Sequence, residues 1–584
     1  MRSIRVAAIA LACLVVSGAT SYGQVGSISG VVVRFPNGDP AAGAVVKLTD
    51  ESPGEAPPAY QLRSTTTAAD GSFRFDGVEP RTYYVVANLS GHLPSEYGQR
   101  SPTGTGIAFE VGSGQRVNLR LTLWPTAGIS GRVFDADGDA VGRAQVLALR
   151  LVYNDGKPSM TIAQTVMTND RGEYRMFWLT PGTYHVAARE WDPNTTAPAV
   201  NIGPPRRFST SEQAVAPFVR SRTLANGMVV EEAAVPIYAP SAHELSLAST
   251  IVLGPGDNAA NVDVQLNDDH VVAHHVRGSL TRIGNERRTL LQLVPRIPAP
   301  FALVAVGVVR QDGVFDIGGV APGSYMLYSP EGLVAQPIDV GDTDVDVAVV
   351  ESALIKLTGR ITFDRGLSGE GVAPKASDLQ IRMTREPELL GAPDGGPRFN
   401  PPPADNGQLN LNSIPPGDYR VEVFPLSNRD GAGPGGPRPS DSHANAYVKS
   451  IRLGDADVLG EGLHLWSATQ PSLEIVIGLN GAQAEGTVAN NRGEPVPNVI
   501  VVAVPDGSNK GRLDLYRQAK TDRRGHFVFV GMAPADYSFY AWDDVERGAW
   551  QSPEFMRAFE GRGRFVRLRE GKNEPLELSV VTAR

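Results

Sequence analysis

The sequence DGSFRFDGVEPRTY, residues 70–83, contains the pattern that decides the fold. A turn with Asp and Gly precedes Phe73 and Phe75, which are two residues apart. Alternate residues of a β-strand point to one face, so we expect both rings in a core. A second turn with Pro80 follows, and Tyr83 then begins another apolar stretch.

This pattern occurs five times along the chain. The copies begin at Asp70, Asp170, Asp312, Asp405 and Asp522 and carry their tyrosines at Tyr83, Tyr184, Tyr325, Tyr419 and Tyr537. Asp and Gly favour tight turns, and Pro followed by Gly favours a type II turn. Each copy is therefore predicted to form a β-hairpin with one face in a core.

Two further blocks accompany the pattern. An alternating strand with a central glycine lies upstream of each copy, at Gly30, Gly131, Gly278, Gly359 and Gly486. A closing strand with alternating apolar residues, such as residues 117–121, ends most units. The repeat spacing of about a hundred residues is the usual size of a domain.

Short strands, regular turns and almost no helical periodicity predict an all-β fold of about five tandem immunoglobulin-like or transthyretin-like β-sandwiches. The predicted sandwiches span residues 25–126, 127–269, 270–352, 353–480 and 481–584. The second is expected to contain a long loop near 195–231, and the fourth to contain Gly/Pro-rich loops at 391–405 and 430–440. Their composition favours disorder.

Residues 1–24 have the pattern of a cleaved signal peptide. Basic residues precede an apolar stretch at 6–16, and small residues then precede Gln24, where cleavage is expected. The pattern predicts a secreted, periplasmic or cell-surface protein, and a retained N-terminal anchor is the alternative. Cys13, the single cysteine, lies within this segment, so no disulfide is expected in the mature chain.

Composition narrows the possible partners. The formal net charge is −9 and the charges are scattered, whereas nucleic acid binding requires a clustered basic face. The most apolar later run, residues 301–309, is too short to span a bilayer. We therefore expect no nucleic acid partner and no transmembrane segment in the mature chain, and the sequence leaves the oligomeric state open.

The glycine-centred strand, the polar turn and the Asp-Gly-x-Phe…Pro-Gly-x-Tyr pattern resemble carboxypeptidase regulatory-like domains. The resemblance covers nearly the whole mature chain and is clearest in the first, second and fifth units. It implies small transthyretin-like or prealbumin-like sandwiches, related in shape to starch-binding and adhesin modules. It also implies a bacterial secreted protein built of several such domains.

The sequence contains no clear motif of a catalytic site. In metallocarboxypeptidases this domain is an appendage, and the zinc-binding His-x-x-Glu pattern of the catalytic domain is absent from this sequence. Gly-x-Ser-x-Gly and phosphate-loop motifs are absent as well. We therefore expect no enzyme activity, no catalytic residue and no cofactor, with a hydrolase whose site is not visible in sequence as the remote alternative.

Two clusters resemble metal sites. Asp135, Asp137 and Asp139 are spaced like a calcium loop, but Ala140 and Val146 stand where such a loop requires Gly and Glu. His270, His274 and His275 form the second cluster. Alternate residues along a strand do not converge on one ion, which argues against the His cluster. We therefore interpret the Asp cluster as a turn and the His cluster as a linker, and we predict no metal site.

Tyr540, Trp542, Asp543 and Trp550 are the candidate ligand-binding residues. Flat aromatic rings stack on the C–H faces of sugars, and a carboxylate accepts hydrogen bonds from hydroxyls. The alternative for Tyr540 and Trp542 is that they alternate inward and fill the last core. Trp550 follows Gly-Ala in a predicted loop and is expected to be exposed.

The sequence thus predicts a non-catalytic extracytoplasmic binding or scaffold protein, with carbohydrate as the favoured ligand. A structural or adhesive cell-envelope protein that contacts protein partners is the alternative.

Overall fold

The computed structural model describes residues 25–49, 63–190, 219–267, 270–282, 289–296, 305–364, 375–386, 398–399, 403–425, 445–467 and 470–582. The predicted signal peptide and the predicted loop at 430–440 lie outside these residues, as do parts of the other two predicted loops.

The fold is all-β, and each predicted sandwich, called units 1 to 5 below, contains two sets of strands, which form separate sheets in units 1 to 4. In unit 5 the two sets are joined by a strand pair, so all of its strands form one continuous sheet. In the first set the glycine-centred strand pairs antiparallel with the aromatic strand and parallel with the closing segment. For units 1 to 3 these strands are β5 (Ser72–Val78), β1 (Gly26–Arg34), β2 (Asp39–Pro40) and β9 (Arg116–Leu123); β13 (Glu173–Leu179), β10 (Ala127–Phe134), β19 (Asn258–Ala259) and β20 (Val264–Gln265); and β25 (Val314–Val320), β22 (His274–Thr281) and β28 (Val345–Val350). For units 4 and 5 they are β32 (Gln408–Ile414), β29 (Ile355–Asp364), β37 (Leu473–Gly478), β34 (Tyr447–Leu453) and β35 (Ala456–Asp457); and β41 (His526–Met532), β38 (Ala482–Ala489), β44 (Gly571–Lys572) and β45 (Leu576–Val581).

The second set of strands includes, in every unit, the strand that contains the repeated tyrosine. In units 1 and 2 its strands are β4 (Arg63–Thr66), β3 (Val45–Thr49), β6 (Arg81–Asn88), β7 (Ser95–Glu96) and β8 (Phe109–Val111); and β12 (Lys157–Met167), β11 (Gln145–Asn154), β14 (Gly182–Arg189), β17 (Ile237–Tyr238) and β18 (Ile251–Leu253). In units 3 to 5 they are β24 (Ala305–Val308), β23 (Leu290–Pro295), β26 (Gly323–Tyr328) and β27 (Ala335–Val340); β31 (Arg398–Phe399), β30 (Leu379–Glu386), β33 (Gly417–Pro425) and β36 (Leu463–Leu465); and β40 (Arg517–Lys520), β39 (Ile500–Pro505), β42 (Asp536–Trp542) and β43 (Arg564–Arg567).

Helical segments are short and lie mostly in unit 5. They are η1 (Leu245–Leu247), η2 (Ala376–Asp378), η4 (Gly507–Gly511), η5 (Leu513–Leu515), η6 (Ala549–Gln551), α1 (Pro553–Met556) and η7 (Arg557–Phe559). Within the described ranges, no helix has the length and apolar character needed to cross a membrane.

Each unit encloses a cluster of buried side chains between its two sheets. In unit 1 the predicted core rings Phe73 and Phe75 pack edge to face, with centroids 6.1 Å apart. In unit 5, Phe527 and Phe529 repeat this contact at 5.8 Å. The alternation in the repeated strand therefore does place these aromatic residues in a core.

The central glycine of each unit is required by a close approach of backbone. A Cβ atom at Gly278 would overlap the carbonyl oxygen of Val347 in the parallel strand β28. The equivalent glycines, Gly30, Gly131, Gly359 and Gly486, meet a carbonyl oxygen of their closing segment in the same way. Glycine recurs here because any side chain would push the parallel neighbour away.

The predicted hairpin is wrong, because the aromatic strand and the tyrosine strand do not pair with each other, and in units 1 to 4 they lie in different sheets. In unit 1, β5 pairs with β1, whereas β6 pairs with β3. The proline turn carries the chain across the core from one sheet to the other. The tyrosine hydroxyl secures this crossing by donating to the backbone carbonyl four residues earlier, from Tyr83 to Glu79, Tyr184 to Thr180, Tyr325 to Ala321, Tyr419 to Pro415 and Tyr537 to Ala533, at 2.6–3.0 Å.

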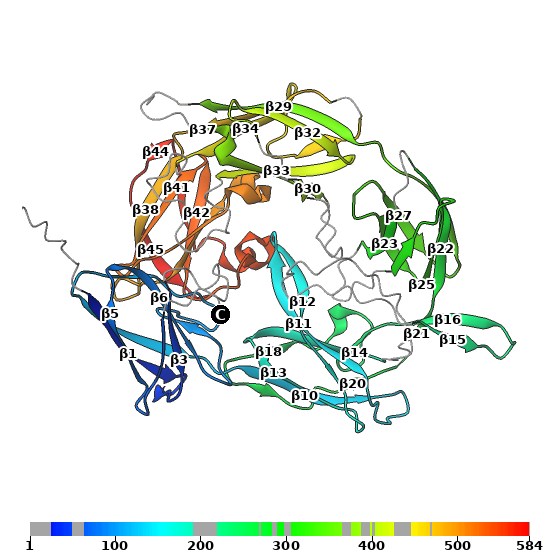
Figure 1. Ribbon diagram of the computed structural model, residues 1–584, viewed down its shortest axis with the longest axis horizontal. Coiled ribbons are helices and arrows are strands. Elements are labelled where there is room, and N and C mark those ends of the chain that lie inside the picture. Colours follow the sequence, from blue (N-terminus) through cyan, green and yellow to red (C-terminus); the bar gives the residue numbers. More distant parts are fainter. Residues whose placement is uncertain are drawn as a thin grey trace, which may run out of the picture.

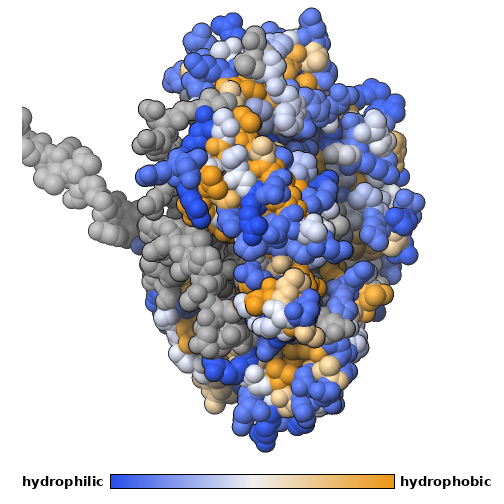
Figure 2. Space-filling view, turned by 90° about the vertical axis from the view of Figure 1, so that its right-hand side faces the viewer, coloured by the Kyte–Doolittle hydropathy of each residue, from blue (hydrophilic) through white to orange (hydrophobic). Residues whose placement is uncertain are grey.

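The five units follow one another around a ring, and unit 5 returns to lie beside unit 1 (Figure 1). The β11–β12 hairpin of unit 2 points inward, toward the short helices of unit 5. On the face seen in Figure 2, hydrophobic residues occur as separate patches among hydrophilic ones.

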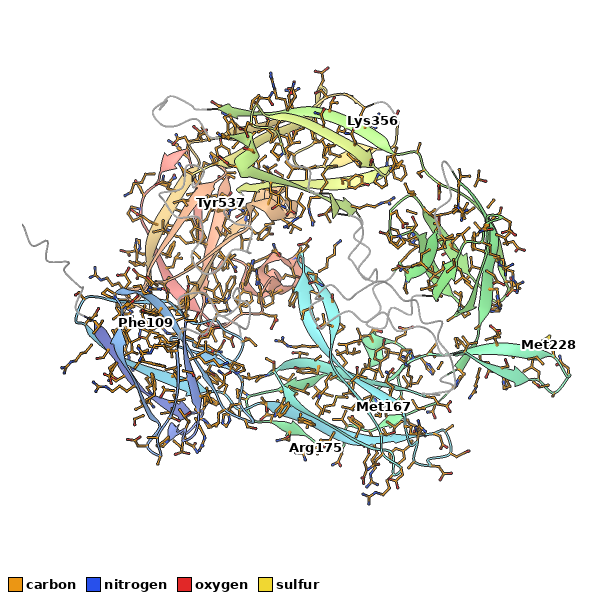
Figure 3. The ribbon with its side chains drawn as sticks, in the orientation of Figure 1. Phe109, Met167, Arg175, Met228, Lys356 and Tyr537 are labelled. Atoms are coloured by element: carbon orange, nitrogen blue, oxygen red, sulfur yellow. The ribbon has the colours of Figure 1, made fainter. Side chains whose placement is uncertain are left out.

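Part of the loop predicted at 195–231 is a second hairpin. β15 (Val219–Thr223) and β16 (Val229–Ala234) pair antiparallel, and β21 (His270–Val272) adds a third strand. The hairpin projects outward from the ring, with Met228 near its tip (Figures 1 and 3). Its polar composition concealed a strand pair whose charges are matched, because Arg220 and Arg222 both pair with Glu232.

The glycine contact predicts a position-specific effect on stability. Gly278→Ala should lower the free energy of unfolding by about 1 to 3 kcal/mol, because the added methyl group forces β28 to shift. Differential scanning calorimetry would measure the change. Gly341→Ala in the same unit is the matched control, because a Cβ there meets no atom within 4 Å. Equal melting profiles for the two variants would contradict the explanation.

Candidate functional site

The predicted ligand-binding residues lie at the inner end of unit 5, where the structure buries most of them. Tyr540 and Trp542 are on β42, stack with ring centroids 5.1 Å apart, and are 7% and 0% exposed. Trp550 is on η6 and is 5% exposed, so the prediction that it is exposed is wrong. Asp543 follows β42 and is half-buried.

These rings are covered because the chain after β42 folds back over them. Phe559 of η7 packs edge-on against Trp542 at 5.6 Å, and Phe555 of α1 lies 6.4 Å from the same ring. Ser552 caps α1 by accepting a hydrogen bond from the backbone N–H of Phe555. As folded here, Trp542 and Trp550 offer no open face to a sugar.

Unit 2 completes this aromatic cluster. Tyr153, near the end of β11, packs against the cluster and lies 6.1 Å from the Phe555 ring. Two glycines allow the backbones to meet: a Cβ at Gly548 would lie 2.9 Å from the Tyr153 carbonyl oxygen, and one at Gly156 would overlap Gln551. The aromatic residues selected from the sequence therefore form the joint between units 2 and 5.

An ion pair at the edge of the cluster supports this joint. Arg150 of β11 lies 2.9 Å from Glu546 of unit 5, and both side chains are largely withdrawn from solvent. Burial raises the pKa of Glu546, and Arg150 opposes that rise. Burial likewise raises the pKa of the Tyr153 phenol.

The tip of the same hairpin reaches unit 4. Asp155 lies 2.5 Å from Arg420 on β33, and Arg420 also contacts Glu386 of β30 at 3.1 Å. Burial raises the pKa of the neighbouring Glu422, against the effect of Arg420. One hairpin thus contacts two other units of the ring.

Units 1 and 5 meet directly through hydrogen bonds to main-chain carbonyls. Asn498 donates to the carbonyls of Gly98 and Thr105, and Lys520 donates to that of Thr105 at 3.2 Å. Burial in this contact lowers the pKa of Lys520 to about 8. The first and last sandwiches are therefore in contact although some 400 residues separate them.

The two clusters that resembled metal sites have other structural roles. Asp135 Oδ1 accepts from the backbone N–H groups of Asp137 and Asp139, which is the geometry of a turn. His275 Nδ1 lies 2.6 Å from Asp316 within unit 3, whereas His270 belongs to the small sheet with β15 and β16. Among the described residues, no group of three or more His, Cys, Asp or Glu side chains is arranged to hold a metal ion.

Exposed aromatic residues lie elsewhere, at positions that sequence reasoning did not select. Phe177 and Trp178 on β13 are 47% and 64% exposed, and their ring centroids are 5.0 Å apart. Trp466 in unit 4 is 65% exposed, and its indole N–H donates to Asp418.

Trp178 also has an unfavourable backbone conformation, with φ at 60°. It occupies the left-handed position of a β-bulge that all five units share, where Gly77, Gly319 and Gly531 stand in three of the others. A residue with a Cβ costs about 1 to 2 kcal/mol in this conformation. Alignment of the five copies would have revealed the tryptophan in a position suited to glycine.

The architecture defines a protein of tandem β-sandwich domains. Within it, residues 27–122 match the family model of the carboxypeptidase regulatory-like domain, which spans nearly all of unit 1. The resemblance inferred from the repeat is thereby confirmed for this unit. No curated protein matches the chain.

Several solved structures are similar to parts of the chain. The TIE protein of Bacillus anthracis is 12% identical over 56% of this chain and 50% of that chain, with a TM-score of 0.16. BcpA, the major pilin subunit of Bacillus cereus, is 11% identical over 56% of this chain and 99% of its own, with a TM-score of 0.15. GBS52, the minor pilin of Streptococcus agalactiae, is 12% identical over 41% and 94%, with a TM-score of 0.19.

The match to the TIE protein spans half of that protein's length. At TM-scores below 0.2, these likenesses carry no argument about how the units are arranged or what the chain binds.

Burial of Trp550 predicts a structural effect of its removal. Trp550→Ala should lower the free energy of unfolding by about 3 to 5 kcal/mol, because it leaves a cavity in the joint between units 2 and 5. Calorimetry would detect the loss. Trp466→Ala removes an exposed ring and should change stability by no more than about 0.5 kcal/mol. A Trp550→Ala protein as stable as the parent would contradict the buried position.

The Lys520 contact predicts a rise in stability with pH. The pKa of Lys520 is about 8 in the fold and 10.5 normally, so the folded state binds fewer protons than the unfolded state between these values. Unfolding in urea should therefore require more denaturant at pH 9.5 than at pH 7.5, and Lys520→Met should show less of this increase. An identical pH dependence in the two proteins would refute the assignment.

Proposed function

We propose that the chain is an extracytoplasmic, non-catalytic scaffold protein whose sandwich surfaces bind carbohydrate. The observation that carries the scaffold role is the set of contacts joining sandwiches that are not neighbours in sequence. Asn498 and Lys520 connect unit 5 to unit 1, and the β11–β12 hairpin connects unit 2 to units 4 and 5. A body held in this way presents its surfaces in fixed relative positions, as a recognition scaffold requires.

The extracytoplasmic location rests on the signal-peptide pattern of residues 1–24 and on the resemblance to secreted tandem-domain proteins. Carbohydrate is the favoured ligand because the described surface carries an exposed aromatic pair, Phe177 and Trp178. Flat, solvated rings with nearby polar groups are suited to the mixed faces of sugars.

A structural or adhesive envelope protein that contacts protein partners is the second candidate. The β15–β16 hairpin favours it, because it projects from the ring and carries exposed Met228 and Val229 at its turn (Figure 3). Apolar side chains on a projecting element are typical of protein contacts.

The test is a pull-down with insoluble polysaccharides together with a glycan array, using residues 25–584. We expect retention on at least one polysaccharide and competition by its soluble oligosaccharide. Binding to no glycan under conditions where calorimetry shows a folded chain would overturn the carbohydrate assignment. Protein contacts through the β15–β16 hairpin would then be the better account.

A further inference from the structure

The shared β-bulge singles out one surface of unit 2. At the bulge, units 1, 3, 4 and 5 carry Asp-Gly, Gly-Gly, Asn-Ser and Val-Gly, at residues 76–77, 318–319, 412–413 and 530–531. Unit 2 carries Phe177-Trp178. Two adjacent exposed rings at a site where the other units have none, one of them in a strained conformation, are features that folding alone does not favour.

The bulge directs these residues away from the core. Tyr174, Met176 and Leu179 on β13 are buried, whereas Phe177 and Trp178 are exposed. Arg175 lies on the same solvent-facing side of the strand, toward the outside of the ring in Figure 3. The aromatic pair is therefore on the outer surface of the ring, where an extended polymer has access.

A polar group lies across the sheet from the rings. β10 runs between β13 and β19, and the bulge in β13 places Phe177 and Trp178 opposite Gly128. Gly128 pairs with the exposed Asn258 on the other side. The Asn258 side chain leans toward β13, because its Oδ1 lies 2.6 Å from the point where a Cβ of residue 128 would be.

The spacing of strands in the sheet sets the width of this surface. Strands in a sheet are about 4.8 Å apart, so β13 and β19 are separated by roughly 10 Å. Gly128 has no side chain, and the Asn258 carboxamide lies over its backbone. The result is a surface with two apolar rings on β13 and a carboxamide beside them.

The surrounding charge does not favour a cationic ligand. Glu173, the nearest carboxylate on β13, pairs with Arg132 at 3.0 Å and with Arg171 at 3.3 Å. It is therefore not available to balance a bound cation. A sugar ring requires no counter-charge, because its C–H face stacks on an aromatic ring and its hydroxyls both donate to and accept from an amide.

We propose that Phe177, Trp178 and Asn258 form a carbohydrate-binding site on the outer sheet of unit 2. A sugar ring stacks on Trp178, with Phe177 holding the indole edge to face, and a hydroxyl of the same or the adjoining residue bonds the Asn258 amide. This proposal rests on the proposed function and gives it a location. In this proposal the strained backbone of Trp178 is retained because it exposes the indole ring on which the ligand stacks.

The decisive variant is Trp178→Gly, which removes the ring and restores the residue that the bulge favours. We expect it to melt at the parent temperature or above while losing at least tenfold in affinity for the soluble oligosaccharide identified on the array, measured by isothermal titration calorimetry. Asn258→Ala should lose affinity less, without loss of fold. A stability gain together with a binding loss separates a ligand role from a packing role.

Two variants serve as matched controls. Ser413→Gly relieves the same backbone strain at the bulge of unit 4 without removing an aromatic ring, because Ser413 has φ of 68°. Trp466→Ala removes an equally exposed tryptophan elsewhere. Both are expected to bind like the parent.

The outcomes distinguish the site from the function. A parent that binds while Trp178→Gly binds equally well overturns this site and leaves the carbohydrate function standing. Loss of binding in Trp466→Ala with retention in Trp178→Gly moves the site to unit 4 and likewise overturns the proposal. A folded parent that binds no glycan overturns both.

Discussion

The crossing between the two sheets is the constraint on which each sandwich depends. The chain leaves the aromatic strand, turns at a proline and enters the opposite sheet, and a tyrosine hydroxyl bonds the carbonyl four residues back. That bond satisfies a polar group that would otherwise be buried unpaired beside the core. It also fixes the angle at which the second sheet begins. The glycine-centred strand, its parallel partner and the bulge then allow the first sheet to cover the same core.

The ring depends on features that distinguish the units rather than on the repeat that unites them. The β11–β12 hairpin is longer than its counterparts, with strands of 10 and 11 residues, and its outer half extends beyond the core of unit 2. Tyr153, Arg150 and Asp155 lie on that outer half and contact units 4 and 5. The ion pairs there are partly buried, so they make the contacts specific more than they make them strong. Aromatic packing supplies the apolar area.

Local patterns in the sequence predicted local structure. The errors arose where the pairing or burial of a residue depends on segments that are distant in sequence. The period-2 alternation, the turn residues and the glycine-centred strands were sufficient for the all-β class and for the core residues. The hairpin was wrong because alternation is the same whether a strand pairs with its successor or with a strand forty residues earlier. Trp550 was misplaced because its cover comes from Phe555, Phe559 and the distant Tyr153. The exposed Trp178 was detectable in principle, because only a comparison between copies is needed to see a tryptophan where glycine is usual.

Contact between the first and last sandwiches has a mechanical consequence. In a linear series of domains, tension applied between the two ends passes through every linker in turn and straightens the chain. Here the hydrogen bonds of Asn498 and Lys520 to unit 1 form a shorter route for the load. A moderate pull would therefore be borne by that small polar contact while the other linkers stay slack. Only after it and the contacts of the β11–β12 hairpin separate would the molecule lengthen toward the span of five sandwiches in series. The closed form therefore holds back an extension that tension can release.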